Sequence, residues 1–401
     1  MKEKKYSLRG VIIAFAAGLV LALLAGGYYM LVTFGGGASL RGAEKFAVLY
    51  NLINSQFIGE VDMEQASEAA YDGLVAATGD RWSYYLTPSE YKSYMDSQNN
   101  RYIGIGVTVS KDTESSFLRI ESVTDDTPAA NAGLKPGELV VALDGVSLEK
   151  LEPSELKERI AEMDGRAFEL TIRDAGGTER TVVLKSEKIF SDPIEYYMLP
   201  DDIGYIKIRN FDKGAASGGR AAIDELKSRG ARGLVFDVRN DPGGLVVELT
   251  QLLDYLLPEG EIFISVAQNG TQAVTRSDAS FTDLPMAVLI NGNSYSAAEF
   301  FAAALSERCK SGFAGLVGTQ TTGKSRSQVT IALSDGSALH LSTNGYLTPN
   351  GVDLAQQGGL VPDYVVELSE EDSTLLRAGR LEYEYDEQLQ RAQQLVAERT
   401  G

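Results

Sequence analysis

The stretch "PMAVLINGNSYSAAEFFAAAL" (residues 285–305) joins a strand-like apolar run to an apolar helix through a short polar turn. Its length and apolar content predict a buried strand followed by a buried helix. Ser296 stands where the helix is expected to begin, as either a helix cap or a nucleophile, and the cap is the commoner case for a single serine. A nucleophilic serine usually takes histidine as its base, but the chain has a single histidine, His340.

The alternation of strand and helix continues on both sides of this stretch. "GLVFDVR" (233–239) is a continuous apolar run of the kind buried in a parallel sheet. Helices are expected at 214–229 and 245–257 as well as after Ser296. This pattern predicts an α/β core with crossover connections over residues 188–368. A polar, helical tail over 369–401 is expected to pack against the core or a partner.

Residues 100–187 have the period of two that is typical of strands. Within them, "TPAANAGLKPGELVVALDGVSL" (127–148) combines a short helix, a glycine stop, a turn and a strand. This stretch resembles the PDZ domains of bacterial proteases, which implies a β-sandwich or barrel with helices. In such domains a glycine-containing loop holds a peptide's terminal carboxylate on its backbone N–H groups. The residues at that place are Gly104, Ile105, Gly106 and Val107.

The N-terminus contains an uncharged apolar segment, residues 11–34, long enough to cross a bilayer as a helix. The positive-inside bias predicts that residues 1–10 are cytoplasmic and that the rest lies outside a cell membrane crossed once. A cleaved signal peptide is the alternative, although its apolar region is usually shorter. Apolar residues at helical spacing predict a helical region over 41–99. The basic residues that set the orientation are Lys2, Lys4, Lys5 and Arg9.

Composition limits the partners. The 401 residues are 44% hydrophobic and therefore sufficient for more than one domain. With 56 acidic and 37 basic residues the net charge is −19, which opposes binding to nucleic acid. Cys309 is the only cysteine, so no intrachain disulfide and no Cys/His zinc cluster can form. We expect no metal and no cofactor.

Three ordered stretches of the α/β core resemble one family, the carboxyl-terminal processing peptidases. This family comprises membrane-associated or secreted serine proteases with a PDZ domain ahead of a Ser/Lys active site. The resemblance runs from about residue 44 to the end and implies a crotonase/Clp-protease-like core. It also implies a possible homodimer, because terminal helices pair protomers in the family. The stretches are "GLVFDVRNDPGGLV" (233–246), "NGNSYSAAEF" (291–300) and "VGTQTTGKSRSQ" (317–328).

Matching these stretches to the family implies that Ser296 is the nucleophile, Lys324 its base and Gln328 the residue that orients the lysine. The chemistry is reasonable, because a lysine can act as a base only when desolvation lowers its pKa. A neutral glutamine can orient that lysine without stabilising its charged form. The expected donors to the oxyanion are the N–H of Ala297 and one from the glycine pair, Gly244 in preference to Gly243.

The chain would then be a membrane-anchored, extracytoplasmic endopeptidase that recognises accessible C-termini of proteins or peptides. Two departures from the family pattern bear on this expectation. Ser325 replaces a glycine, which predicts backbone strain, and Tyr295 is expected to narrow the pocket for the residue before the scissile bond. One alternative is an inactive PDZ scaffold or ligand-binding protein on the same fold. Another, acyl-CoA chemistry on a crotonase core, explains neither the anchor nor the PDZ-like module. His340 lies outside the matched stretches and is expected to be structural.

Overall fold

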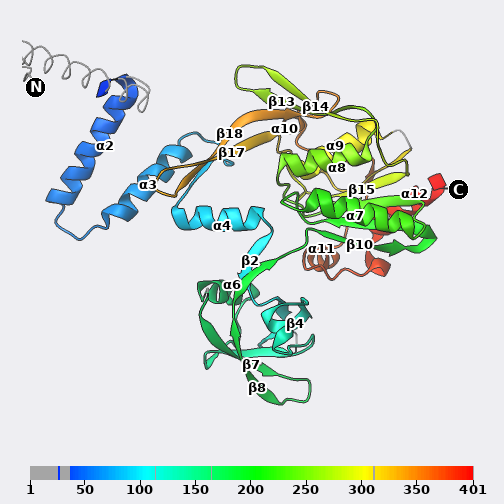
Figure 1. The fold of residues 1–401 in the computed structure, drawn as a ribbon, viewed down its shortest axis with the longest axis horizontal. Coiled ribbons are helices and arrows are strands. Elements are labelled where there is room, and N and C mark those ends of the chain that lie inside the picture. Colours follow the sequence, from blue (N-terminus) through cyan, green and yellow to red (C-terminus); the bar gives the residue numbers. More distant parts are fainter. Residues whose placement is uncertain (1–25, 28–36, 113, 164, 310–311, 401) are drawn as a thin grey trace, which may run out of the picture. The chain divides into compact units, whose positions relative to one another are not determined.

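The computed structural model describes residues 26–27, 37–112, 114–163, 165–309 and 312–400 (Figure 1). The predicted membrane anchor, residues 11–34, lies outside this part of the chain except for two glycines. Over the described ranges, no helix combines the length and the apolar character that a membrane span needs. The chain divides into two compact units, Met1–Gly79 and Asp80–Gly401.

The first unit is helical, as its apolar spacing predicts. It contains α2 (Gly37–Gln56) and α3 (Met63–Ala76). The Asp62 carboxylate begins α3 by accepting hydrogen bonds from two backbone N–H groups of its first turn. The second unit opens with β1 (Tyr84–Leu86) and α4 (Pro88–Gln98). A capping box from the preceding threonine and a proline at the first helical position begin α4.

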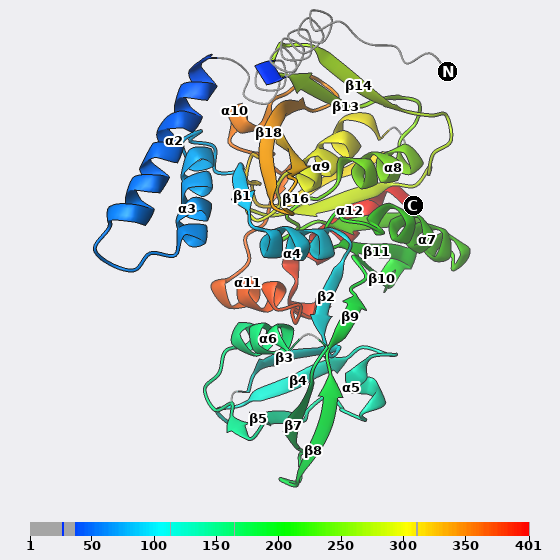
Figure 2. The ribbon, with the colours of Figure 1, turned by 60° about the vertical axis from the view of Figure 1, so that its left-hand side comes forward.

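A six-stranded antiparallel sheet forms the PDZ-like module: five strands follow the order β3-β4-β5-β7-β8, and β6 pairs with β5 (Figure 2). Its strands enclose a core of buried aliphatic side chains around Phe168, and β3 lies at the edge of the sheet. The elements are β3 (Val107–Lys111), β4 (Leu118–Val123), α5 (Pro128–Asn131), β5 (Leu139–Leu143), β6 (Val146–Ser147), α6 (Pro153–Glu162), β7 (Ala167–Arg173) and β8 (Glu179–Lys185).

Two antiparallel strands connect this module to the rest of the second unit. The chain enters through β2 (Arg101–Gly104) and returns through β9 (Glu187–Phe190) (Figure 2). In their register Arg101 lies opposite Phe190 and Gly104 lies opposite Glu187. The module is therefore an insertion whose two ends are paired with each other.

A six-stranded sheet in the order β10-β11-β12-β15-β16-β19 forms the α/β core. β10 is antiparallel to β11, and the later strands are parallel, as the crossover pattern predicts. Every residue of β12 and β15 is buried. The strands are β10 (Ile194–Leu199), β11 (Ile203–Ile208), β12 (Gly233–Asp237), β15 (Met286–Ile290), β16 (Phe313–Gly318) and β19 (Tyr364–Val365).

Both faces of this sheet are covered, which explains its continuous apolar strands. Alternate residues, such as Leu234 and Phe236, pack with α7 (Ala215–Ser228), α8 (Val246–Leu256) and α9 (Ala297–Arg308). Val235 faces the other side, where α12 (Glu387–Thr400) packs. The expectation that the polar tail packs against the core is thus confirmed for α12. The remaining described helices are α10 (Leu354–Gln357) and α11 (Glu370–Arg377), with 3-10 turns at Pro200–Asp202 and Tyr383–Tyr385.

A second sheet in the order β1-β18-β13-β14, with β17 paired to β18, lies beside this core. It brings β1 onto β18, so that Tyr84 is opposite His340. The segment just before the PDZ-like module therefore meets a strand some 250 residues later in the chain. The strands are β13 (Gly260–Ala267), β14 (Gln272–Ser277), β17 (Arg326–Ala332) and β18 (Ala338–Leu347).

A buried ion-pair network attaches the start of α12 to the core sheet. The Arg239 guanidinium donates to both carboxylate oxygens of Asp237 and both of Asp386, at 2.7–2.9 Å. It also donates to the Gln388 side chain at 2.9 Å, while the Tyr205 hydroxyl donates to Asp237 at 2.8 Å. All five side chains are buried. A buried pair of this kind is costly to break because the remaining partner keeps its charge.

We expect Asp386→Ala to lower the free energy of unfolding by about 3 kcal/mol, because it removes one of the two carboxylates that pair with the buried guanidinium. Urea denaturation of the full chain measures the change. Glu371→Ala, on the exposed face of α11, is the matched control and should leave the midpoint unchanged. Equal midpoints for the two variants would show that the network does not hold the tail.

Candidate active site

The turn between β15 and α9 holds Ser296 in an unusual backbone conformation. Its φ is 58° and its ψ is −124°, in a region that L-residues rarely occupy. The turn is fixed by bonds to the end of β12: the Ser294 hydroxyl donates to the Val238 carbonyl at 2.7 Å, and the Tyr295 N–H donates to the Asp241 carbonyl at 3.1 Å. Ser296 occupies the cap position at the start of α9, as expected, and does so at a strained turn.

The glycine pair after β12 packs directly against this turn. Gly243 has a φ of 89°, and a β-carbon added to it would lie 2.8 Å from the Ala297 nitrogen. The Gly243 N–H already donates to the Asp241 carboxylate at 2.7 Å. Gly244 has a φ of 150° and lies against the Phe211 backbone. The Gly243 N–H is therefore already occupied, and the N–H groups of Gly244 and Ala297 stay the predicted oxyanion donors.

One buried carboxylate connects the Ser296 turn to the segment that carries Lys324. Glu299, in the first turn of α9, is fully buried and accepts the Ser296 N–H at 2.9 Å. It also accepts the Gly323 and Lys324 N–H groups at 2.6 and 2.8 Å and the Thr321 hydroxyl at 2.5 Å. Burial raises the pKa of this carboxyl group, and the four donors oppose that rise. Glu299 therefore fixes both segments relative to each other.

Lys324 lies in a cavity of about 580 Å³ that is also lined by Ser296, Gln328 and the glycine pair. Its Nζ is 4.3 Å from the centre of the Trp82 ring and 5.8 Å from that of Tyr295. Burial lowers the pKa of the Lys324 amine to about 8, an effect that Arg81 increases and the Asp80 and Glu299 carboxylates oppose. A substantial fraction of this amine is therefore neutral near pH 8.

Gln328 is in the cavity but makes its hydrogen bonds elsewhere. Its Nε2 donates to the Arg326 carbonyl at 3.1 Å and to the Ser342 hydroxyl at 2.9 Å. His340 lines the same cavity, stacked on Tyr84 with 4.5 Å between ring centres. Burial, with a smaller contribution from Lys324, lowers the pKa of His340 to about 4, so its ring is neutral at ordinary pH.

Ser325 does not carry the strain that its replacement of glycine predicts. Among the described residues it is not one of those with a positive φ, and its hydroxyl donates to the Asp353 carboxylate. The left-handed backbone conformation of this loop lies two residues earlier, at Gly323. Gly323 has a φ of 82°, and a β-carbon there would lie 2.8 Å from the Gly359 nitrogen. The glycine that this loop requires is therefore retained.

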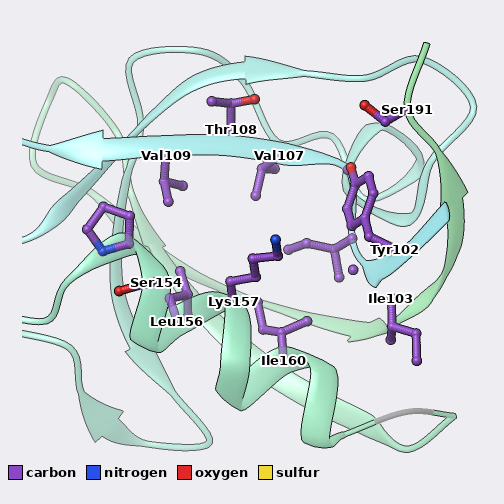
Figure 3. A pocket seen from close by; sticks show the side chains of 14 residues that line it. Tyr102, Ile103, Val107, Thr108, Val109, Ser154, Leu156, Lys157, Ile160 and Ser191 are labelled. Carbon is purple, nitrogen blue, oxygen red and sulfur yellow. The ribbon is translucent and has the colours of Figure 1, made fainter. Parts of the chain in front are cut away.

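The four loop residues predicted to bind a carboxylate line a second cavity, of about 470 Å³, between β3 and α6 (Figure 3). The Ile105 and Gly106 carbonyls face inward and accept the Ala129 and Thr124 N–H groups at 2.9 Å. Among the described residues, no backbone hydrogen bond has the N–H of Ile105 or Gly106 as its donor. Position 106 requires glycine, because its φ is 86° and an added β-carbon would collide with the Thr127 side chain.

Two residues of this site, the buried Glu299 and the cavity-lining Trp82, were not predicted from the sequence. Glu299 carried a signal, because an acidic residue three positions after a serine that begins a helix is the pattern of a capping box. Trp82 carried none, since nothing in its local sequence shows that it meets Lys324. Its proximity depends on the long-range pairing of β1 with β18.

Comparison with protein families identifies two matches in this chain. The model described as "Peptidase family S41" matches residues 202–366, which include the Ser296 turn and the Lys324 segment. The model described as "PDZ domain" matches residues 119–174, within the inserted module. The two matches agree with the two parts of the second unit that the structure shows.

Individual proteins are similar over most of the chain. A "Carboxy-terminal-processing protease" of Bartonella bacilliformis is 31% identical over 80% of this chain and 74% of its own length. A "Probable CtpA-like serine protease" of Staphylococcus haemolyticus is 30% identical over 80% of this chain, which spans 64% of that protein. The crystal structure "Putative S41 protease from Bacteroides fragilis" has a TM-score of 0.57 and 17% identity, covering 85% of this chain and 92% of its own, and shows the shared fold.

We expect Trp82→Ala to raise the pKa of Lys324 from about 8 toward its ordinary 10.5, because water then reaches the amine and this gain exceeds the lost attraction between the indole ring and the ammonium group. Acylation of Lys324 by a limiting amine reagent, followed by peptide mass spectrometry across pH 6 to 11, measures this pKa. Trp82→Phe keeps an aromatic wall and should shift the curve much less. A curve that is the same in all three proteins would exclude the indole as the desolvating group.

We expect Glu299→Gln to slow labelling of Ser296 by a serine-directed phosphonate by about tenfold or more, a loss of about 1.4 kcal/mol. The amide has one acceptor oxygen for four donors, so the turn and the Lys324 segment lose their common anchor. Glu259→Gln, an exposed change of the same chemistry, is the control. Unchanged labelling in Glu299→Gln would show that the carboxylate does not position Ser296.

Proposed function

The chain belongs to the carboxy-terminal-processing proteases of peptidase family S41 and is a serine-type peptidase, and from this premise we propose that it is a membrane-anchored, extracytoplasmic endopeptidase that recognises protein C-termini. In this proposal Ser296 is the nucleophile, Lys324 the base and Gln328 the residue that orients Lys324. One observation carries it. A serine at a strained helix start and a lysine with a lowered pKa line the same cavity, with their backbones joined through Glu299.

The proposed reaction begins when the Ser296 hydroxyl attacks a peptide carbonyl carbon. The neutral Lys324 amine accepts the hydroxyl proton, and the carbonyl oxygen becomes an oxyanion bound by the N–H groups of Ala297 and Gly244. The lysine ammonium then donates its proton to the leaving amine as the C–N bond breaks. Water then loses a proton to the same lysine and attacks the ester carbonyl carbon. As the bond from that carbon to the Ser296 oxygen breaks, the lysine returns the proton to this oxygen, which restores both residues.

Two further residues adjust the proposed base. Burial favours the neutral amine, whereas the faces of the Trp82 and Tyr295 rings attract the ammonium form. This balance keeps the pKa near the working pH, where a base is most effective. Gln328 is proposed to orient the amine through its carboxamide oxygen. Its NH₂ group already donates to the Arg326 carbonyl and the Ser342 hydroxyl, so the oxygen is the atom left to accept from Lys324.

Substrate recognition is proposed to occur in the groove of the PDZ domain. Its edge strand, β3, can pair with an extended peptide, and the unused N–H groups of Ile105 and Gly106 lie where the terminal carboxylate would end. Tyr295, on the wall of the catalytic cavity, is proposed to limit the size of the residue before the scissile bond.

The membrane anchor is proposed from the sequence alone. Residues 11–34 carry no charge, and the preceding residues include four basic side chains. This arrangement supports an anchored protein whose catalytic part lies outside the cytoplasm. Because apolar residues 11–34 follow a short basic segment, cleavage as a signal peptide is the competing outcome, and N-terminal sequencing of the mature protein distinguishes the two.

Proteolysis of casein by the full chain in mild detergent tests the mechanism. The rate should rise as pH increases through about 8, because deprotonation of Lys324 produces the base. Ser296→Ala and Lys324→Arg should each lose about a thousandfold or more in rate, since arginine keeps the charge but cannot accept a proton. Lys227→Ala, on the exposed face of α7, is the control.

Two results would contradict the proposal. Cleavage by Ser296→Ala at the wild-type rate would exclude this serine as the nucleophile. A wild-type protein that is inert toward both casein and a peptide with a free apolar C-terminus would favour an inactive scaffold that only binds peptides.

A further inference from the structure

The groove between β3 and α6 contains one charged side chain in otherwise uncharged walls. Of the residues that line it, all within the described chain, only Lys157 carries a charge. Figure 3 shows Val107 and Val109 projecting from β3 toward α6, and the Lys157 side chain extending from α6 into the same space. Leu156 and Ile160 form the buried apolar floor beside it. A peptide that fills this groove must therefore contact an ammonium group.

Covering that ammonium with an apolar side chain would be unfavourable. Lys157 is exposed to solvent, and among the described residues it makes no ion pair. A bound peptide would remove part of its hydration, which costs free energy unless the peptide supplies an acceptor or a negative charge. The Lys157 ammonium would therefore favour a peptide that places a carboxylate beside it and disfavour a peptide that covers it with an apolar side chain.

The position of the matching carboxylate follows from strand geometry. A peptide that pairs antiparallel with the free edge of β3 places its terminal carboxylate at the 104–107 loop, where β3 begins. Side chains of an extended peptide alternate, so the last residue and the third from the end both face α6. The last residue meets the apolar floor at Ile160. The third residue from the end of the peptide lies over the preceding turn of α6, and this turn carries Lys157.

We propose that Lys157 is a specificity-determining residue that selects C-termini with Asp or Glu as the third residue from the end and an apolar last residue. The terminal carboxylate itself is bound by the backbone N–H groups of the loop, so the lysine remains available for the side chain. This inference rests on the proposed recognition of C-termini, but it is independent of the catalytic residues.

Fluorescence polarisation with the full chain carrying Ser296→Ala measures the preference. Two labelled octapeptides differ only in Glu or Gln at the third position from the end, and each is made as a free acid and as a C-terminal amide. We expect the Glu free acid to bind about threefold more tightly than the Gln free acid, the size of an exposed ion pair. The ratio should approach one at high salt.

Variants of Lys157 then assign the preference. Lys157→Gln should reduce the ratio to about one, and Lys157→Glu should reverse it so that the Gln peptide binds more tightly. Lys185→Gln, at an exposed position of β8 outside the groove, is the matched control and should keep the threefold ratio.

Three outcomes would overturn the inference. A Glu preference that survives Lys157→Gln would assign it to another residue. Equal weakening of the Glu and Gln free acids by Lys157→Gln, with the amides unaffected, would assign the lysine to the terminal carboxylate. If no peptide binds, the groove does not read C-termini at all, and casein cleavage by the wild-type chain then shows whether the proposed peptidase function stands without it.

Discussion

The carboxylate of Glu299 is the constraint on which the site depends. It is fully buried and accepts hydrogen bonds from the Ser296 turn and from three donors of the segment that carries Lys324. A serine in an unfavourable backbone conformation persists only where its surroundings determine that conformation. Here three hydrogen bonds fix the conformation of Ser296. One runs from its own N–H to Glu299, and the other two run from Ser294 and Tyr295 to the segment that follows β12. The same side chain thus sets the geometry of two segments that are 28 positions apart in the sequence.

The parallel sheet explains why these segments meet. β12 and β15 are neighbours and run in the same direction, so the loops that follow them leave from the same edge. One loop carries the glycine pair and the other carries Ser296. The register places Asp237 beside Leu289, which brings the two loops to the same level. Burial of both strands under helices on each face then makes this edge a rigid base for the reaction.

Local patterns in the sequence predict the helices and strands of the core, because those signals are themselves local. The apolar runs of β12 and β15, the cap of α4 and the glycine at 106 each reflect a conformational requirement of a few neighbouring residues. The surroundings of Lys324 are different. Trp82 and His340 reach the cavity through pairing between β1 and β18, and no local periodicity records such a pairing. The expectation of strain at Ser325 failed for a related reason, since the left-handed position depends on the approach of Gly359 to Gly323.

The paired strands β2 and β9 have a consequence for how this protein could have been assembled. Because Arg101 and Phe190 are direct partners across an antiparallel pair, their Cα atoms are separated by only about 5 Å. A tight two-residue turn could therefore replace everything between them without moving the flanking chain. The peptidase core and the PDZ domain are separable parts in this sense. Loss or exchange of the whole PDZ domain would therefore need changes at this one narrow junction only, and the sheet that carries Ser296 would keep its flanking chain.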